Sequence, residues 1–240
     1  MFNTTVQYIC SIQFMEVVVE DNMKRSEDTK SKLIDAAGEV FVERGFRSAT
    51  VRDICSRAGT PLGAMNYHFR DKQGLYAAVL EHSHKTAITK YPPGLGIRDG
   101  ATPAERLRTF IHTFLLRLSD TGVPAWHMKL MFQEISDPTG DTGVLDQVVE
   151  SSIRPLYTYL ASILSELLKE ENPSAAEESD EIFLCAMSIV GQCCHYYTGR
   201  RVLAALRPKG FDLADIERIA DHITLFSLAG IRQLAEEKSR

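Results

Sequence analysis

Residues 49–72 of this 240-residue chain read ATVRDICSRAGTPLGAMNYHFRDK. A short helix is predicted over Thr50–Ala58, because Thr50 suits the helix N-cap and Asp53, three residues later, completes a capping-box pattern. Gly59 is expected to end that helix. A second is predicted over Thr60–Phe69, whose Thr-Pro start suits a cap and a first helical residue. Two helices of about two turns joined by a tight glycine-containing turn form a helix-turn-helix.

A longer helix is predicted on each side of this motif. The upstream helix, from Ser26, has apolar residues at helical spacing at Leu33, Ala37, Val40 and Phe41. Gly45 is expected to end it. Downstream, Asp71 is expected to cap a helix that runs through Leu80. The motif and its flanking helices predict a small helical domain of the helix-turn-helix class.

The clearest break in the chain is the YPPGLG stretch at residues 91–96. We therefore expect a helix-turn-helix domain over residues 23–90 and a larger domain over residues 91–240. Further helices are expected at about 103–119, 124–136, 144–169, 175–206 and 213–237, and Pro155 is expected to kink or restart the third of them. The predicted fold class is all-α, with an N-terminal three-helix helix-turn-helix domain followed by a larger α-helical domain.

Residues 1–22 contain apolar stretches that Gln7 and Glu16 interrupt, and no Lys or Arg precedes them. This pattern argues against a signal peptide or a membrane span, and we expect no membrane partner. Met23 is followed directly by the basic pair Lys24-Arg25, so the natural start could lie at Met23. We expect residues 1–22 to be an accessory or disordered extension.

The net charge of −5 is unevenly divided along the chain. Residues 24–90 carry 12 Lys and Arg against 8 Asp and Glu, a net of +4, whereas residues 1–23 carry −3 and residues 91–240 carry −6. A basic block on an acidic chain is expected where one end meets phosphate. This asymmetry favours DNA as a partner of the N-terminal domain.

Five cysteines form no paired framework, and their spacing resembles no zinc site, so we expect no metal, no cofactor and a cytoplasmic location. Adjacent Cys193 and Cys194 could form a redox sensor, or they could be small buried hydrophobic residues. Residue types used in catalysis are present at His127, Glu134, Cys194 and His195. No nucleophile elbow, phosphate-binding glycine loop or His-Glu-x-x-His motif accompanies them. We therefore expect that the protein is not an enzyme. The other alternative is an interaction protein that has the same fold but does not bind DNA.

The sequence also resembles a known family at positions distributed through the motif. The matching positions are Thr50–Ile54, Ala58, Gly59, Gly63–Phe69 and Lys72. They closely resemble the TetR family of bacterial transcriptional regulators over about residues 28–80. Residues 188–193 and 223–230 look like the C-terminal domain of its YbiH/CecR branch. The resemblance implies a homodimeric, ligand-responsive regulator of operator DNA, usually a repressor; activation is not distinguished by sequence.

The second helix of the motif fits the major groove of double-stranded DNA. The candidate DNA-binding residues are Thr50, Arg52, Leu62, Gly63, Ala64, Asn66, Tyr67, His68 and Lys72. Asn66 could read adenine, and Leu62 and Ala64 could contact a thymine methyl. The residues suited to phosphates are Thr50, Arg52, Tyr67, His68 and Lys72. Each has a structural alternative: Thr50 as a helix cap only, Tyr67 and His68 as packing residues, and Lys72 as a solvated charge. Leu62 is also expected to point inward with Met65 and Phe69.

Two further sites are expected in the C-terminal domain. A small-molecule effector is predicted to bind among Phe114, Trp126, Met128, Met131, Phe132, Tyr157, His195 and Tyr196, although such a stripe could be plain core. The last helix has small and large residues at helical spacing, and the resemblance implies that it forms a four-helix dimer interface with the helix at about 175–206. The candidate interface residues are Ile216, Ala220, Ile223, Ser227, Gly230 and Leu234; the alternative is a buried helix of a monomer.

Overall fold

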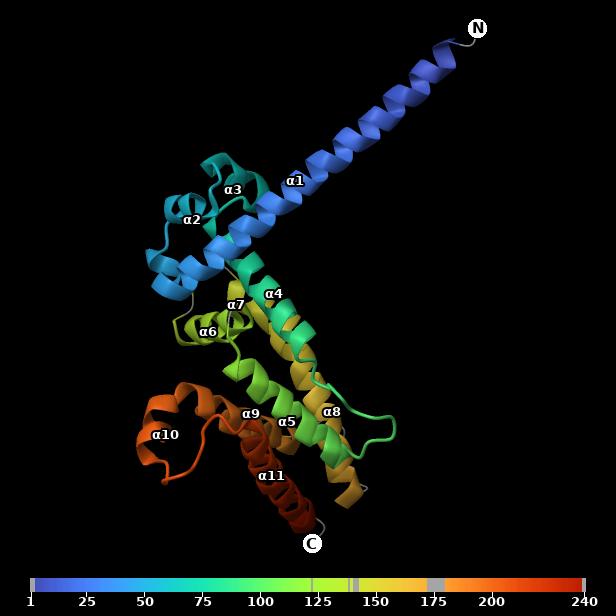
Figure 1. Cartoon of the computed structure of the whole chain (residues 1–240). Helices are drawn as coiled ribbons and strands as arrows, with labels where there is room; N and C mark the ends of the chain where they lie inside the picture. Colours follow the sequence, from blue (N-terminus) through green and yellow to red (C-terminus); the bar gives the residue numbers. More distant parts are fainter. Residues whose placement is uncertain (1–2, 122, 138, 140–142, 172–179, 239–240) are drawn as a thin grey trace. The chain divides into compact units, whose positions relative to one another are not determined.

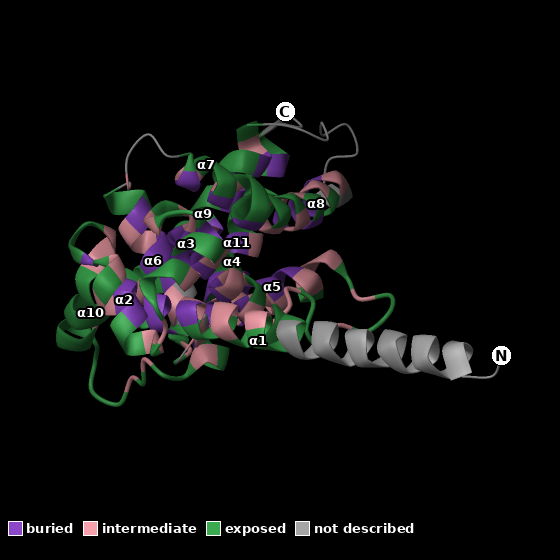
Figure 2. Ribbon diagram, turned by 90° about the horizontal axis from the view of Figure 1, so that it is seen from above, coloured by how far each residue is buried: buried purple, intermediate pink, exposed green. Residues whose placement is uncertain are grey.

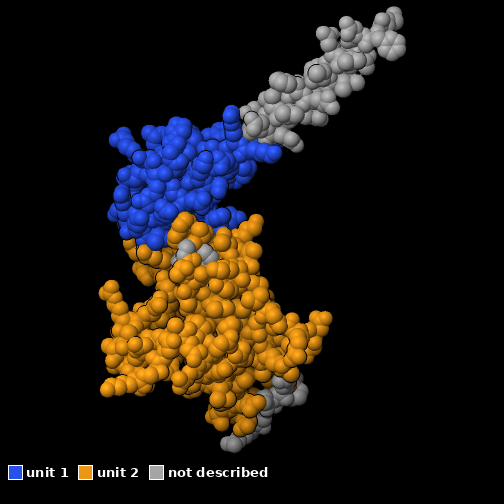
Figure 3. Space-filling model, viewed as in Figure 1, with its two compact units in different colours: residues 1–82, 139–142 blue, residues 83–138, 143–240 orange. Residues whose placement is uncertain are grey.

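The computed structural model describes the backbone of residues 3–121, 123–137, 139, 143–171 and 180–238. Throughout these ranges the regular secondary structure is helical, which confirms the all-α fold class (Figure 1). The chain forms two compact units, residues 1–82 with 139–142 and residues 83–138 with 143–240 (Figure 3). Their boundary falls inside one helix, whereas the sequence suggested a boundary at residues 91–96.

The first unit contains the predicted helix-turn-helix. Its helices are α1 (Asn3–Ser48), α2 (Val51–Ala58), α3 (Leu62–Phe69) and the first part of α4 (Lys72–Lys90). Helix α1 includes the backbone of residues 3–22, and the accessory or disordered character expected of residues 1–22 stays a prediction. Gly45 leaves the helical region at φ 73° and ψ 167°, at the expected end of the upstream helix.

The core of this unit is built from the apolar stripe predicted for α1. All four stripe residues are buried: Leu33, Ala37, Val40 and Phe41. The rings of Phe41 and Phe46 each lie with their centroids 5.0 Å from that of Tyr76 in α4. Met65 and Phe69 of α3 are also buried. Figure 2 colours the described residues by their burial. Aromatic packing at this spacing fixes α4 against α1.

The second unit contains the remaining helices. They are α5 (Pro103–Ser119), α6 (Val123–Ser136), α7 (Val144–Val148), the π-helical turn η1 (Val149–Ile153), α8 (Arg154–Glu171), α9 (Asp180–Thr198), α10 (Arg200–Leu206) and α11 (Ile216–Lys238). The expected interruption near Pro155 takes the form of a restart, because the π-helical turn η1 ends immediately before α8 begins at Arg154. A proline lacks the N–H that a continuous helix needs. The expected helix at 175–206 divides at Gly199, and its residues 175–179 lie outside the described residues.

Helix α5 is the centre of the second unit. It begins with a complete capping box, in which Thr102 Oγ1 accepts from the Glu105 N–H and the Glu105 carboxylate accepts from the Thr102 N–H. It packs against α8, α9 and α11 through one buried apolar cluster. The cluster includes Leu107 and Ile111 of α5, both fully buried. This framework holds the residues of α5 that face the cavity described below.

Candidate DNA-binding surface and ligand cavity

Helix α2 is fixed at both ends by interactions visible in the sequence motif. Thr50 Oγ1 accepts from the Asp53 N–H at 3.1 Å and donates to Asp53 Oδ2 at 2.7 Å. The hydrogen bond from Thr50, and next the Arg44 guanidinium, holds the pKa of Asp53 below its ordinary value. Gly59 ends the helix at φ 64°, a conformation that glycine adopts without strain. The Thr50 hydroxyl therefore serves as a cap, while Arg52 remains exposed.

An ion-pair cluster joins α2 to α1. Arg57 Nη1 and Nη2 each lie 3.0 Å from a carboxylate oxygen of Glu43, and Nη1 lies 3.4 Å from Glu39. The hydrogen bonds to Glu43 raise the pKa of Arg57. Exposed pairs contribute little stability singly, but this bidentate geometry fixes the orientation of α2.

Helix α3 presents one face to solvent. Leu62 is 49% exposed and Tyr67 is 80% exposed, and Gly63 and Asn66 lie on the same side of the helix. This exposure corrects the expectation that Leu62 points inward with Met65 and Phe69. The remaining candidates, Ala64 and His68, are half-buried. A Cβ built on Gly63 would contact nothing within 4 Å, so this face has room for a close neighbour.

Lys72 has a different environment from the one expected of a phosphate-binding or solvated charge. Its Nζ donates to the carbonyl oxygens of Phe46 at 2.9 Å and Ala49 at 3.1 Å. It also lies 4.3 Å from the centroid of the Phe46 ring. The ammonium thus satisfies carbonyls where α1 ends, which the sequence could not show because these residues are 23 and 26 positions away. Any phosphate contact by Lys72 remains a prediction.

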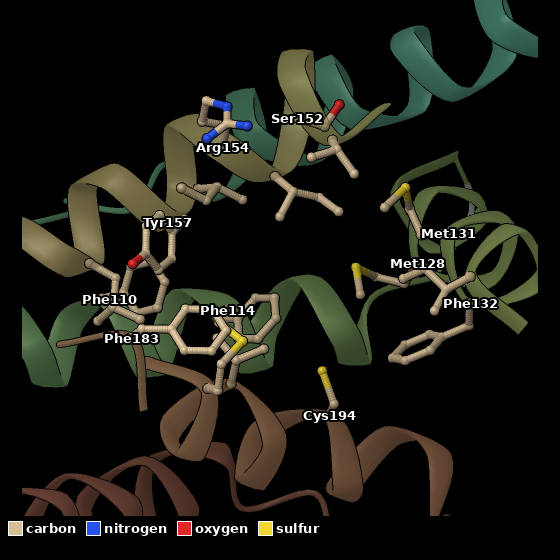
Figure 4. A pocket seen from close by; sticks show the side chains of 17 residues that line it. Phe110, Phe114, Met128, Met131, Phe132, Ser152, Arg154, Tyr157, Phe183 and Cys194 are labelled. Carbon is tan, nitrogen blue, oxygen red and sulfur yellow. The ribbon is translucent and has the colours of Figure 1, made fainter. Parts of the chain in front are cut away.

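The second unit contains a cavity of about 590 Å³ (Figure 4). Side chains from α5, α6, η1, α8 and α9 line it: Phe110, Phe114, Met128, Met131, Phe132, Ile135, Val149, Ser152, Ile153, Arg154, Leu156, Tyr157, Leu160, Phe183, Met187, Val190 and Cys194. Five of the predicted effector residues are among them, namely Phe114, Met128, Met131, Phe132 and Tyr157. Ring systems and thioethers dominate the wall, so the cavity suits an apolar molecule.

Three predicted effector residues lie outside this lining: Trp126, His195 and Tyr196. His195 is exposed, and Tyr196 packs against the buried cluster instead. The face of α9 that lines the cavity is Phe183, Met187, Val190 and Cys194. Their spacing of four, three and four residues is helical, so the sequence carried a signal for this stripe, but several apolar stripes on α9 compete with it.

The polar groups at the cavity are few. Among the described residues that line the cavity, Arg154 is the one with a charged side chain. Its Nε lies 2.6 Å from Glu150 Oε2. Burial raises the pKa of the Cys194 thiol to about 11 and that of its neighbour Cys193 to about 12. Both thiols are therefore protonated near neutral pH, whereas a redox-sensing cysteine needs an accessible thiolate. The environment favours the reading of both as small hydrophobic residues.

The face of α11 chosen from the sequence is largely an inner face. Ala220 and Ile223 are buried in the chain's own apolar cluster, because α11 packs against α5, α8 and α9. Ser227 is also buried, and Ile216 packs against the cluster. The predicted interface residues Gly230 and Leu234 are exposed. Other exposed apolar residues on these helices are Leu225 (71%) and Phe226 (65%) of α11 and Phe183, Leu184 and Met187 of α9, while the interface itself stays a prediction.

In the part of the chain that the structure describes, no three His, Cys, Asp or Glu side chains gather as a metal ion would require. Across the same residues, no helix has the length and apolar character needed to cross a membrane.

Two family models match the two parts of the chain. A model described as "Bacterial regulatory proteins, tetR family" matches residues 33–79. A second, described as "HTH-type transcriptional dual regulator CecR, C-terminal domain", matches residues 103–231, which is more than half of the chain. The chain belongs to the TetR family of bacterial transcriptional regulators. Within that family its C-terminal domain is of the CecR type.

Individual relatives agree with this assignment. The HTH-type transcriptional regulator SrpR of Pseudomonas putida is 39% identical over 72 residues, 30% of this TetR-family chain and 34% of SrpR. The match thus spans about a third of this curated relative's length.

Two solved structures share the fold. FadR of Bacillus subtilis in complex with stearoyl-CoA has a TM-score of 0.59 at 20% identity, covering 83% of this chain and 98% of FadR. AibR in complex with isovaleryl coenzyme A and operator DNA has a TM-score of 0.59 at 16% identity, covering 82% and 97%.

Proposed function

We propose that this TetR-family chain is a homodimeric cytoplasmic repressor, released from its operator by an apolar small molecule that binds in the cavity. The observation that carries the proposal is the exposed face of α3, supported from behind by buried Met65 and Phe69. A rigid helix with an exposed polar and apolar face suits the major groove. Activation is the second candidate, favoured by the words "dual regulator" in the description of the matching C-terminal domain.

The residues of α3 and α2 divide into two roles on DNA. Asn66 is suited to paired hydrogen bonds with adenine, and Leu62 and Ala64 to contact with a thymine methyl. Gly63 allows the helix backbone to approach the bases, because no side chain fills the space beside it. Tyr67, Arg52 and His68 are suited to phosphates, which set affinity and register. Thr50 and Lys72 support this surface mainly from within, through the cap and the carbonyl contacts described above.

A homodimer is supported by the exposed faces of α9 and α11, two helices that pack against each other. Along α9 the exposed residues Leu184, Ser188 and Gly191 follow helical spacing. Along α11, Phe226 and Ala229 do the same. Small residues beside large ones let helices of a second copy approach closely, as in a four-helix interface. Such a dimer would place two α3 helices about 34–36 Å apart, one turn of DNA.

The dimer has a direct test in solution. A Phe226→Arg variant places a charge in the proposed interface, and light scattering should then give the mass of a monomer. Leu206→Arg is the matched control, because Leu206 of α10 is 75% exposed and lies outside the proposed interface. A wild-type chain that is monomeric at micromolar concentration, or a dimer that Phe226→Arg leaves intact, would contradict this interface.

The effector class follows from the wall of the cavity. Its apolar lining, with Arg154 as the charged side chain, fits an aliphatic or aromatic molecule with at most one acidic group inside. Methionines such as Met128 and Met131 adapt to irregular shapes. Acyl-CoA thioesters are the first compounds to test, because the FadR and AibR structures of the same fold contain them. In such a ligand the acyl chain would occupy the cavity.

The single tryptophan, Trp126, provides a probe of this cavity. It lies on α6, the helix that carries Met128 and Met131. Binding of stearoyl-CoA, isovaleryl-CoA or a free fatty acid should change its fluorescence and release DNA. Val190→Phe, which fills the cavity, should abolish both effects, whereas Val202→Phe on exposed α10 should not. Equal responses from the two variants would place the effector elsewhere.

A further inference from the structure

Arg70 follows the last residue of α3 and has an unusual backbone. Its φ is 67° and its ψ is −54°, and among the described residues other than glycine it is the one with a positive φ. The Asp71 N–H donates to the Phe69 carbonyl oxygen at 2.8 Å, two residues back. This combination is a γ-turn with positive φ, which is rare and strained for a residue with a side chain. Glycine would adopt it with little strain.

The surrounding structure prevents the turn from relaxing. The Phe69 carbonyl also faces Gly74 in the first turn of α4, where a Cβ would come within 2.2 Å of its oxygen. Asp71 Oδ1 accepts from the Gly74 N–H at 2.8 Å and so caps the amino end of α4. On the other side, the Arg70 N–H donates to the Asn66 carbonyl at 3.2 Å. The strain at Arg70 is therefore held in place from both helices.

The side chain of Arg70 is placed to act outside the protein. The residue is exposed, and its guanidinium has no hydrogen bond or ion pair within the described part of the chain. It directly follows the helix whose exposed face carries Gly63, Asn66 and Tyr67. A free guanidinium at the end of a groove-binding helix is suited to a DNA phosphate.

We propose that Arg70 is a DNA-phosphate contact, for which the protein tolerates a strained turn where glycine would be more stable. The inference rests on the proposed DNA-binding function of α3. It assigns to Arg70 a sequence-independent contact, because phosphates carry no base identity. Stability and DNA affinity should therefore respond in opposite directions when the side chain is removed.

The test compares Arg70→Gly, Arg70→Gln and Arg70→Lys with the wild type. Binding is measured on a random-sequence duplex and on the fragment that the wild type selects from genomic DNA. Arg70→Gln and Arg70→Gly should weaken binding to both duplexes and lower the slope of log affinity against log salt by about 1 for each recognition helix. Arg70→Lys should keep the slope. Arg70→Gly should also raise the melting temperature by about 2–4 °C, since relief of strain stabilises the folded state.

Arg98→Gln is the matched control, because Arg98 is an exposed arginine of the second unit with a side chain 90% exposed. It should leave affinity and salt slope unchanged. If Arg70→Gln binds both duplexes with the affinity and slope of the wild type, the proposed contact is wrong even though DNA binding stands. If the wild type itself binds no duplex, the DNA-binding function fails first. A melting temperature that Arg70→Gly lowers would contradict the assignment of strain.

Discussion

Replacement of Arg117 by methionine should make this protein more stable, although it removes a buried hydrogen bond. Arg117 lies on α5 with only 1% of its surface exposed. Its Nη1 donates to the Tyr91 carbonyl at 2.6 Å, while Nη2 has no hydrogen-bond partner among the described residues. Its guanidinium carbon lies 5.5 Å from the centroid of the Phe114 ring. No carboxylate of the described residues contributes to the electrostatics of this guanidinium.

The magnitude follows from the cost of burying the charge. Desolvation lowers the pKa of Arg117 to about 10, well below the ordinary value of a guanidinium. A change of this size corresponds to roughly 3 kcal/mol, since each tenfold change is about 1.4 kcal/mol. The hydrogen bond to Tyr91 offsets about 1.5 kcal/mol of this cost. Arg117→Met, which keeps the volume and loses the charge, should therefore raise the free energy of unfolding by about 1–2 kcal/mol.

The assay is urea denaturation followed by circular dichroism, together with the melting temperature. The melting temperature should rise by roughly 3–6 °C for a unit of this size. Arg106→Met on the same helix is the matched control, because Arg106 pairs with Glu166 at a more exposed position and should change stability by less than about 1 kcal/mol. A loss of 2 kcal/mol or more in Arg117→Met would refute the reasoning and show that the hydrogen bond outweighs desolvation.

Three further predictions concern single side chains. Lys72→Met should lower the free energy of unfolding by about 2–3 kcal/mol in urea denaturation, because two carbonyls lose their hydrogen-bond donor. An unchanged denaturation midpoint would contradict this structural role of Lys72. Thr50→Ala should cost about 1 kcal/mol through loss of the α2 cap, and Thr50→Ser should restore most of it; equal stabilities would contradict a capping role. Burial, and next the charge of Arg117, lowers the pKa of His84 to about 4, so the unfolded chain takes up a proton before the folded one. The free energy of unfolding should therefore fall as the pH falls from about 6.5 towards 4. In denaturation series across that range, the free energy of unfolding of His84→Gln should depend less on pH than that of the wild type. Parallel curves of free energy against pH for the two proteins would exclude His84 as the cause.

The sequence predicts best where local chemistry decides the structure. Thr50 and Asp71 cap the helices expected of them, because an N-cap depends on residues three positions apart. The buried stripe of α1 follows from the 3.6-residue period alone. Gly59 turns the chain between α2 and α3 through its positive φ, as its position in the motif indicated.

The sequence predicts less where contacts join distant segments. Lys72 reaches carbonyls more than twenty residues away, a contact that no local pattern encodes. On α11 the period shows an apolar stripe at Ala220 and Ile223 but does not show that the chain itself covers it. The same difficulty explains the effector site, where Phe114 and Tyr157 line the cavity but His195 does not. Helical periodicity identifies a face, and only the packing of the other helices shows what that face meets.

The measurement that tests the central claim most directly is binding of the purified protein to genomic DNA fragments, followed by affinity for the recovered fragment at two salt concentrations. The comparison protein carries Asn66→Ala and Tyr67→Ala, two exposed α3 residues whose replacement leaves the buried core intact. The account predicts saturable, sequence-selective binding that weakens with salt and is lost in this variant. Selection that recovers no fragment above random DNA, or a variant that binds the recovered fragment as tightly as the wild type, would contradict the assignment of α3 as the recognition helix.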